Sequence, residues 1–358
     1  MEDSDTCPFS LEEAKSSFLR TLSKLDPKDS EGFVEWVTEH CSNAYTCKQS
    51  GENIDYTFKW AEKRLKNITK DIKRIIPLQG VLETEKIRHP EEGKGLACER
   101  STTVHVDSFL YNDEDIDKLC DEGRMSRNYC KQCGSHNTAP LTFISHSSSL
   151  VQLKFIFQAA LSSIATNFAD KLLVDVGSRL GAVLYGASVL SMVPMINERC
   201  LFFFTQAYHF SPIKKIVGVE INSELCDLQQ KITEKYRMHD RVELFLKFQN
   251  NFFAADIVVL NNVFEFFLSM NQQIRTWKFI REHVTKPGCI LVTVPSLEEA
   301  TEFNNKPCID VNSWVKPCIV NYDVLEIPLL EEDLDELQNI FFYQTMEALD
   351  VLQAKFAK

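Results

Sequence analysis

The chain has 358 residues, of which 44% are hydrophobic and 25% charged, so it is too apolar for a disordered protein and long enough for one large domain with a smaller attachment. Its 39 basic and 51 acidic residues give a net charge of −12, which argues against general avidity for nucleic acid or an anionic membrane. The acidic N-terminus lacks the apolar core of a signal peptide, and the 12 cysteines are spread along the chain. We therefore expect an intracellular protein, cytoplasmic or nuclear, that does not span a membrane.

Apolar residues at helical spacing predict a helical N-terminal region over residues 1–90. Ser10 and Glu13 form a capping-box pattern before the first helix, and a second begins near Phe33. A third is expected over residues 56–76, and its apolar side would consist of Trp60, Leu65, Ile68, Ile72 and Ile75. Seven basic residues at positions 59–74 indicate a solvated face or, alternatively, a contact surface for RNA or an acidic partner.

Residues 91–149 form a connector rich in cysteine and histidine. Cys130 and Cys133 are separated by two residues and could grip one tetrahedral zinc ion, with Cys120 and His136 as further ligands. Such a zinc would be structural, fixing a loop-rich segment; the alternative is a set of reduced thiols. A redox role is disfavoured because no thioredoxin-like strand and helix surround the pair.

From residue 150 to 358 short apolar runs alternate with helical ones. Strands are expected at 171–176, 215–220, 256–260 and 289–294, and a last one at 341–343; the helices between them are expected at 150–168, 181–190, 223–236 and 270–284. Continuous apolar strands separated by helices are typical of a parallel sheet covered on both faces. The fold class is therefore α/β, with a Rossmann-like, doubly wound, mainly parallel sheet.

Three polar motifs follow these strands. A glycine bend with Asp175, Gly177, Ser178 and Gly181 joins the first strand to its helix, where backbone N–H groups are free to bind a nucleotide-type ligand. Glu220 ends the second strand, where an acid can accept hydrogen bonds from ribose hydroxyls. Asn261 and Asn262 end the third strand and offer donors and acceptors to a reacting group.

In this order the motifs D-x-G-S-x-x-G, V-G-V-E, D-I-V-V-x-N-N and K-P-G-x-x-L-V resemble the class I S-adenosylmethionine-dependent methyltransferases. The pieces V-G-V-E-I-N and N-N-V-F are similar in particular to the non-SET histone lysine methyltransferases related to the disruptor of telomeric silencing. The resemblance covers residues 150–300, less than half of the chain. It implies S-adenosylmethionine as cofactor and a methyl acceptor on a protein side chain.

The resemblance also implies roles for single residues. Asp175, Gly177, Ser178 and Gly181 would surround the methionine end of the cofactor, and Glu220 would bind its ribose. Asn261 would stand between the cofactor and the substrate, with Asn262 beside it in the catalytic motif.

Three departures from the family pattern keep a rival interpretation open, in which the protein is a catalytically inactive methyltransferase-like binding module. Arg179 replaces the middle glycine of the bend, and residues 191–210 form a long apolar insert. No acid for the adenine amino group follows the strand at Val242, since Glu243 lies at its beginning. A third interpretation is a zinc-stabilised protein that contacts RNA through Lys63, Arg64 and Lys70. Hydrolase and nucleotide-kinase motifs are absent from the sequence.

Overall fold

The computed structural model describes residues 26, 29, 52–87, 101–131, 138–164, 168, 170–190, 213–246, 254–261, 264–320 and 336–346. The chain forms two compact units, Met1–Lys59 and Trp60–Lys358, and the side-chain contacts below lie in the second. The helices expected near Ser10 and Phe33 lie outside the described residues. The division of the sequence at 90/91 and 149/150 stays a prediction.

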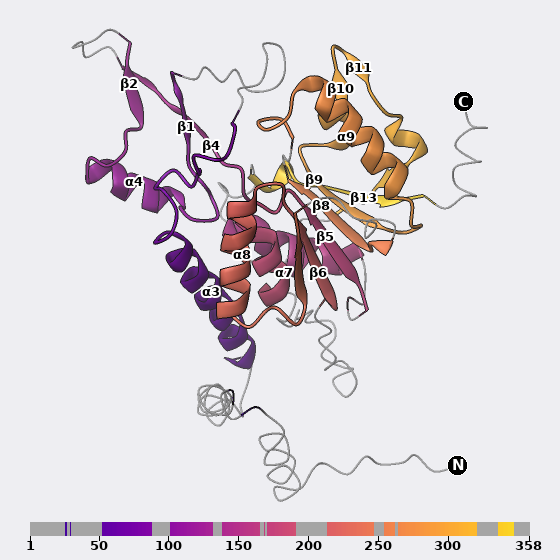
Figure 1. Ribbon diagram of the computed structural model, residues 1–358, viewed down its shortest axis with the longest axis horizontal. Helices are drawn as coiled ribbons and strands as arrows, with labels where there is room; N and C mark the ends of the chain where they lie inside the picture. Colours follow the sequence, from indigo (N-terminus) through magenta and orange to yellow (C-terminus); the bar gives the residue numbers. More distant parts are fainter. Residues whose placement is uncertain are drawn as a thin grey trace, which may run out of the picture. The chain divides into compact units, whose positions relative to one another are not determined.

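A seven-stranded sheet in the order β12-β13-β9-β8-β5-β6-β7 forms the centre of the second unit (Figure 1). Its parallel strands are β5 (Leu172–Val176), β6 (Lys215–Val219), β7 (Val242–Phe245), β8 (Ile257–Asn261) and β9 (Ile290–Val294). At one edge β13 (Phe341–Thr345) and β12 (Val315–Pro317) run antiparallel. The predicted α/β fold with a mainly parallel sheet is confirmed.

Helices cover both faces of this sheet because its apolar residues point to both sides. On one face Trp277 and Ile280 of α9 (Met270–His283) pack in the same core cluster as Val174 and Val258. On the other face lies α7 (Ala182–Leu190), where a Cβ on Gly218 of β6 would come within 2.8 Å of Leu184. The missing side chain at position 218 therefore lets α7 approach the sheet closely.

The expected helix before the first strand is a composite of α5 (Leu150–Lys154), the π-helix η1 (Phe155–Ala160) and α6 (Leu161–Ile164). It begins at Ser149, whose capping box with Gln152 satisfies free backbone groups. Helix α8 (Ser223–Lys235) follows β6 and begins after the cap residue Asn222. The remaining short elements after β9 are α10 (Leu297–Ala300), β10 (Glu302–Phe303), β11 (Lys306–Pro307) and η4 (Val311–Ser313).

Small elements precede the sheet in the chain. Strands β1 (Thr103–His105) and β4 (Thr142–Ile144) pair in parallel, and β2 (Asn128–Cys130) pairs antiparallel with β3 (Thr138–Pro140). Helix α4 (Asp113–Asp121) lies between them in sequence and is capped by Asn112.

Helix α3 (Glu52–Ile72) corresponds to the expected third helix. Its inner face is fully buried and consists of Ala61, Leu65, Ile68 and Ile72. The sequence analysis wrongly placed Ile75 on this face: the helix ends at Ile72, so the spacing of 3.6 residues per turn no longer applies, and Ile75 is 56% exposed.

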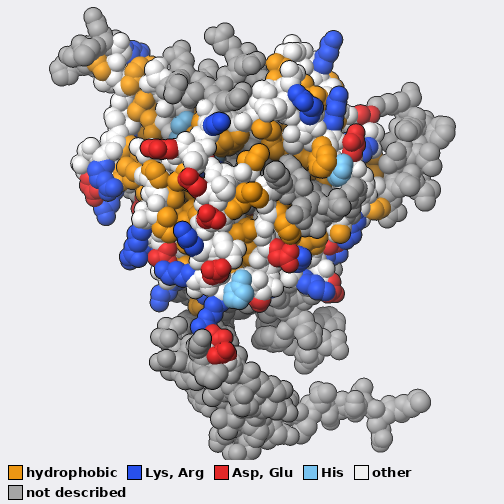
Figure 2. Space-filling view, in the orientation of Figure 1, with side chains coloured by type: hydrophobic (Ala, Val, Ile, Leu, Met, Phe, Trp, Pro, Cys, Tyr) orange, Lys and Arg blue, Asp and Glu red, His pale blue; other side chains and the backbone are white. Residues whose placement is uncertain are grey.

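The basic residues on and just after α3 differ in exposure. Lys63, Lys66 and Lys70 of the helix and Arg74 after it are exposed, and Figure 2 shows Lys and Arg side chains along this side of the molecule. Arg64 is partly buried and donates to the backbone carbonyl of Tyr236. Arg64 therefore attaches α3 to the end of α8 and is less available to an outside partner than the sequence analysis expected.

None of the helices in the described part of the chain is long and apolar enough to cross a membrane. The helix expected at 181–190 is the buried helix α7. The insert at 191–210 lies outside the described residues.

Candidate functional site

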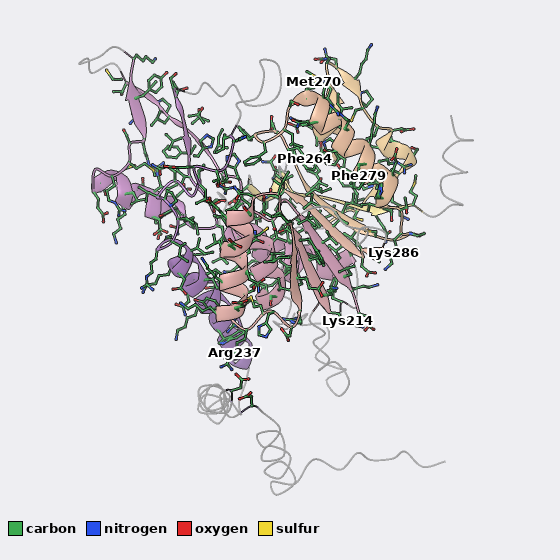
Figure 3. All side chains as sticks on the ribbon, in the orientation of Figure 1. Lys214, Arg237, Phe264, Met270, Phe279 and Lys286 are labelled. Atoms are coloured by element: carbon green, nitrogen blue, oxygen red, sulfur yellow. The ribbon has the colours of Figure 1, made fainter. Side chains whose placement is uncertain are left out.

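The strand order reverses between β5 and β8, since the chain continues from β5 to β6 and β7 on one side and from β8 to β9 on the other. In open α/β sheets, ligands bind at the carboxyl ends of the strands at such a switch point. Figure 3 labels Phe264 near this end of the sheet, and Lys214 and Lys286 near the opposite end. Asp175, Glu220 and Asn261 all lie at the carboxyl ends of β5, β6 and β8, as the sequence predicted.

The glycine bend after β5 has the backbone form that the sequence suggested. Gly177 has a φ of 70° and is exposed, whereas its neighbours Val176 and Ser178 are buried. The N–H groups of Gly177 and Ser178 both donate to the Val219 carbonyl, at 2.8 and 3.1 Å. Gly181 has a φ of 87°, and a Cβ there would lie 2.6 Å from the Tyr185 ring. The bend therefore presents accessible backbone at Gly177 beside the end of β6.

Glu220 is 7% exposed and faces the glycine bend. Its Oε2 accepts from the Arg179 N–H at 2.8 Å, and its Oε1 accepts from the N–H groups of Ile221 and Asn222 at 2.7 and 2.8 Å. Burial raises the pKa of Glu220, and these three N–H groups oppose that rise. A carboxylate has about four lone-pair sites, so one site on Oε2 is left for a ligand hydroxyl.

Asp175 is 3% exposed, and its Oδ2 has no hydrogen-bond partner within the described residues. Burial raises the pKa of Asp175 well above its ordinary value, and the nearby negative charge of Glu220 adds to the rise. A buried polar oxygen without a donor costs free energy. The atom is therefore suited to a cationic or hydrogen-bond-donating ligand group.

Arg179 has a φ of 45°, in the left-handed region that favours glycine. Its guanidinium is buried and contacts Glu85 through Nε at 2.7 Å and Asp107 through Nη1 at 2.6 Å. The Nη2 atom donates to the Gly80 carbonyl at 2.5 Å. Arg179 therefore preserves the bend and joins it to segments that precede the sheet in the chain.

Two exposed apolar side chains near Glu220 were not predicted from the sequence. Ile221 is 83% exposed and lies two residues after the end of β6, and Leu246 is 46% exposed and directly follows the adjacent strand β7. The Glu220 N–H donates to the Phe245 carbonyl at 3.0 Å, so these strand ends are in register. Both residues lie at the carboxyl ends of their strands, on the Glu220 side of the switch point. The signal in the sequence was a large apolar residue within two positions of each strand end.

Asn261 is partly buried, and its Nδ2 donates to Ser148 Oγ at 2.9 Å. Ser147 Oγ in turn donates to Asp107 Oδ2 at 2.6 Å. Residues 145–149 therefore connect Asp107, the partner of Arg179, with the end of β8. Asn262 lies outside the described residues.

The other candidate residues are only partly accounted for. Cys120 is partly buried in α4 and Cys130 is exposed at the end of β2, whereas Cys133 and His136 lie outside the described residues. Within the described ranges, His, Cys, Asp and Glu form no group of three or more that could hold a metal ion. The zinc site stays a prediction.

Among the described residues, no acid for an adenine amino group follows β7. Glu243 is the second residue of β7 and pairs with Lys215, the first residue of β6, at 2.8 Å, so its side chain points toward the amino ends of these strands. The residues that follow Leu246, from 247 to 253, lie outside the described part.

Comparisons with known proteins give a fold-level likeness. No protein-family model matches the sequence, and no curated protein matches it significantly. Among solved structures, an RNA methyltransferase from Salinibacter ruber in complex with S-adenosyl-L-homocysteine is 15% identical, over 56% of this chain and 94% of that chain, with a TM-score of 0.31. A precorrin-6y C5,15-methyltransferase from Geobacter metallireducens is 16% identical, over 37% and 56%, with a TM-score of 0.25.

The [4+2]-cyclase SpnF is also similar, at 17% identity over 37% of this chain and 42% of that chain, with a TM-score of 0.25. Likenesses at these identities and TM-scores carry no argument about activity, and the matched proteins include both methyltransferases and a cyclase. The fold described above therefore rests on the strand order and pairing of this chain itself.

Proposed function

We propose that this chain binds S-adenosylmethionine at the carboxyl ends of β5, β6 and β7 and transfers its methyl group to a protein side chain. The observation that carries the proposal is the buried Glu220 carboxylate beside the exposed Gly177 bend, with Ile221 and Leu246 next to it. A nucleoside needs these features together: an acceptor for its hydroxyls, close backbone, and an apolar surface for its base.

The unpartnered Oδ2 of Asp175 supports the same ligand. S-adenosylmethionine carries an ammonium group, and a buried carboxyl oxygen without a donor is suited to bind one. Two neighbouring carboxyl groups, Asp175 and Glu220, also favour a ligand with positive charge. The residues present therefore fit this cofactor on the methionine and ribose sides.

The bound cofactor would supply an already activated methyl group, so the protein needs to align the acceptor and exclude water. Asp175, Glu220 and the backbone at Gly177 would orient the donor. Asn261, held by Ser148, would stand between the donor and the acceptor. This division of roles requires no metal ligand and no strong general base.

The rival is an inactive binding module, and one observation favours it. Three backbone N–H groups already bind Glu220, and Arg179 ties the bend to Asp107. In that case the hydrogen bonds of Glu220 would serve only to hold the bend, and ligand affinity would be lost.

Calorimetric titration of S-adenosylmethionine and S-adenosylhomocysteine into the full chain separates these functions. We expect saturable binding, weakened about tenfold or more by Glu220→Ala, equivalent to ~1.4 kcal/mol. Glu243→Ala is the matched control, since the Glu243 side chain pairs with Lys215 at the start of β6. The affinity of this variant for both ligands should stay within twofold of wild type. Absence of binding heat from the folded wild type would favour the binding module.

A further inference from the structure

A pair of histidines lies on the other side of the switch point from Glu220. His105 ends β1 and His146 follows β4, and Nδ1 of His105 lies 3.0 Å from Nε2 of His146. The two rings stack with centroids 5.1 Å apart. Phe266 and Phe267, from the segment after β8, contact the His146 ring edge to face at 5.0 and 5.2 Å. We call these four side chains the histidine cluster.

The backbone around His146 places this cluster beside the candidate catalytic residue. Ser147 and Ser148, the next two residues, bond to Asp107 and Asn261, respectively. Phe266 follows Asn261 by five residues on the same connection. The cluster therefore adjoins the end of β8, whereas Glu220, Ile221 and Leu246 follow β6 and β7. A donor bound on the β6 side leaves the β8 side for its acceptor.

His146 has one ring nitrogen to offer a ligand. Its Nε2 faces His105, and its Nδ1 is buried without a hydrogen-bond partner in the part of the chain that the structure describes. Burial lowers the pKa of His146 to about 3, and the positive charge of Arg179 and the neighbouring His105 add to the effect. The ring is therefore neutral, and its surroundings disfavour a cation.

These contacts point to a particular kind of acceptor. A neutral ring nitrogen can pair with an N–H group, and the surrounding aromatic rings favour a flat partner. A neutral imidazole has both properties, with an N–H on one nitrogen and a nucleophilic lone pair on the other. A lysine ammonium lacks a free lone pair, and the buried, aromatic surroundings of His146 disfavour its charge.

We propose that the histidine cluster binds the methyl-accepting group and that this group is the neutral imidazole of a protein histidine. The assignment as an acceptor site rests on the proposed function. The acceptor's N–H would donate to His146 Nδ1 in the tautomer in which His146 Nε2–H donates to His105 Nδ1. Its other nitrogen forms the bond to the methyl carbon while the carbon–sulfur bond breaks and its electron pair goes to sulfur. The resulting imidazolium then loses its N–H proton to water.

The test uses full-length protein with isotope-labelled histidine rings, observed by NMR at pH 8, where free imidazoles are mostly neutral. The probes are 4-methylimidazole, n-butylammonium and cytosine, which represent a histidine, a lysine and a nucleobase. We expect saturable shifts of the His105 and His146 signals with 4-methylimidazole alone. Equal or stronger shifts with n-butylammonium or cytosine, or no shift with 4-methylimidazole, would overturn the proposal.

Two variants locate the contact on the ring. His146→Asn places an acceptor oxygen close to the position of Nδ1, whereas His146→Gln places its polar group near Nε2 and the bond to His105. Binding of 4-methylimidazole to both variants is followed through the His105 signal. We expect the affinity of His146→Asn to lie within about threefold of wild type and that of His146→Gln to be at least tenfold weaker. Equal binding to both variants would contradict a role for Nδ1. If either variant fails to fold, the comparison of probes on wild type decides alone.

The same samples are titrated calorimetrically with S-adenosylhomocysteine, so that the two proposals fail separately. We expect the affinity for S-adenosylhomocysteine to stay within twofold in both variants, because the cluster lies away from Glu220. Wild type that binds 4-methylimidazole but not S-adenosylhomocysteine would overturn the donor site and leave a neutral-ring site. Wild type that binds S-adenosylhomocysteine but not 4-methylimidazole would overturn the acceptor site.

Discussion

Asp107 Oδ2 lies 2.6 Å from Arg179 Nη1, although 72 residues separate them in sequence. Both side chains are buried, and Glu85 is the second carboxylate on the same guanidinium. This ion pair explains how the chain accommodates arginine where the resembling family has glycine. The backbone of residue 179 keeps the left-handed form, and its side chain binds the segments that precede the sheet.

Arg179→Gly, which restores the glycine of the family pattern, is therefore expected to weaken the protein. It removes left-handed strain at residue 179 but leaves two buried carboxylates unpaired. Breaking a buried pair in this way costs about 3–5 kcal/mol. Chemical denaturation should show a loss of that order, together with weaker binding of S-adenosylhomocysteine.

The control for Arg179→Gly adds Glu85→Gln and Asp107→Asn to the same chain. These changes remove the uncompensated charges, so part of the lost stability should return. An Arg179→Gly variant as stable as wild type would contradict the role assigned to the ion pair.

Asp175→Asn is expected to stabilise the ligand-free protein and to weaken cofactor binding. The pKa of Asp175 is raised in the folded protein by burial and by Glu220, so the folded state holds a proton that the unfolded state releases. Stability is therefore lost as the pH rises from the unfolded pKa of about 3.9 toward the folded one. Asparagine carries no charge and should raise the melting temperature most at pH 8 and least at pH 4.

Binding of the cofactor should release a proton from Asp175, because the ammonium group of the ligand favours the charged carboxylate. Titrations in buffers of different ionisation enthalpy measure this release directly. We expect up to one proton per bound ligand in wild type and a smaller number in Asp175→Asn. Identical proton release from both proteins would refute the pairing of Asp175 with a cationic group.

Asp71→Asn tests the attachment of α3 to α8. Asp71 accepts from Lys235 at 2.7 Å and from the Tyr236 hydroxyl at 2.6 Å, and these two hydrogen bonds lower its pKa. Because the pKa of Asp71 is lower in the folded protein, its charged form stabilises the fold. This stability is fully present above the unfolded pKa of about 3.9 and is lost as the pH falls through the folded pKa. We expect a loss of about 1 kcal/mol at pH 7 that shrinks as the pH falls below the unfolded pKa and Asp71 becomes protonated in the folded state as well.

Denaturation curves of Asp71→Asn across this pH range measure the effect. Asp227→Asn, an exposed acid on α8, is the control and should change stability little at any pH. A deficit in Asp71→Asn that stays constant from pH 7 to pH 2 would show that the charge of Asp71 is not the cause.

An RNA partner at α3 would contact the exposed residues Lys63, Lys66 and Lys70. Each phosphate contact on a single strand contributes about 0.7 to the slope of log affinity against log salt. Changing all three to alanine should therefore lower that slope by about 2. Lys73 pairs with Asp115 at 3.0 Å, so Lys73→Ala should change the salt slope less than the change of any one exposed lysine does. A wild-type affinity independent of salt would exclude this surface as an RNA site.

A structural zinc ion on Cys120, Cys130, Cys133 and His136 predicts about one metal per chain in the purified protein. Cys130→Ser and Cys133→Ser should each lower the metal content by elemental analysis, because serine is a poor zinc ligand. Cys289 is buried in β9's entry turn and belongs to the core, so Cys289→Ser serves as the control. Near-zero metal in wild type and variants alike would leave the reduced-thiol interpretation.

The order of the elements and the common location of three candidate site residues could be predicted from the sequence alone. Runs such as 171–176 and 256–260 are short, continuously apolar and separated by helices, and such strands form a parallel sheet whose carboxyl ends meet. Asp175, Glu220 and Asn261 follow those runs directly, so their common location followed from the topology. The same local reasoning failed at Ile75, because the end of α3 depends on what the chain packs against next.

Only the tertiary structure decided what surrounds these residues. The partners of Arg179 come from Gly80, Glu85 and Asp107, and no local pattern links positions so far apart. The His105–His146 contact likewise depends on the pairing of β1 with β4, which brings together residues 41 positions apart. Burial and long-range pairing set the charge and hydrogen bonds of a side chain, whereas sequence spacing sets only which residues share a strand end or a helix face.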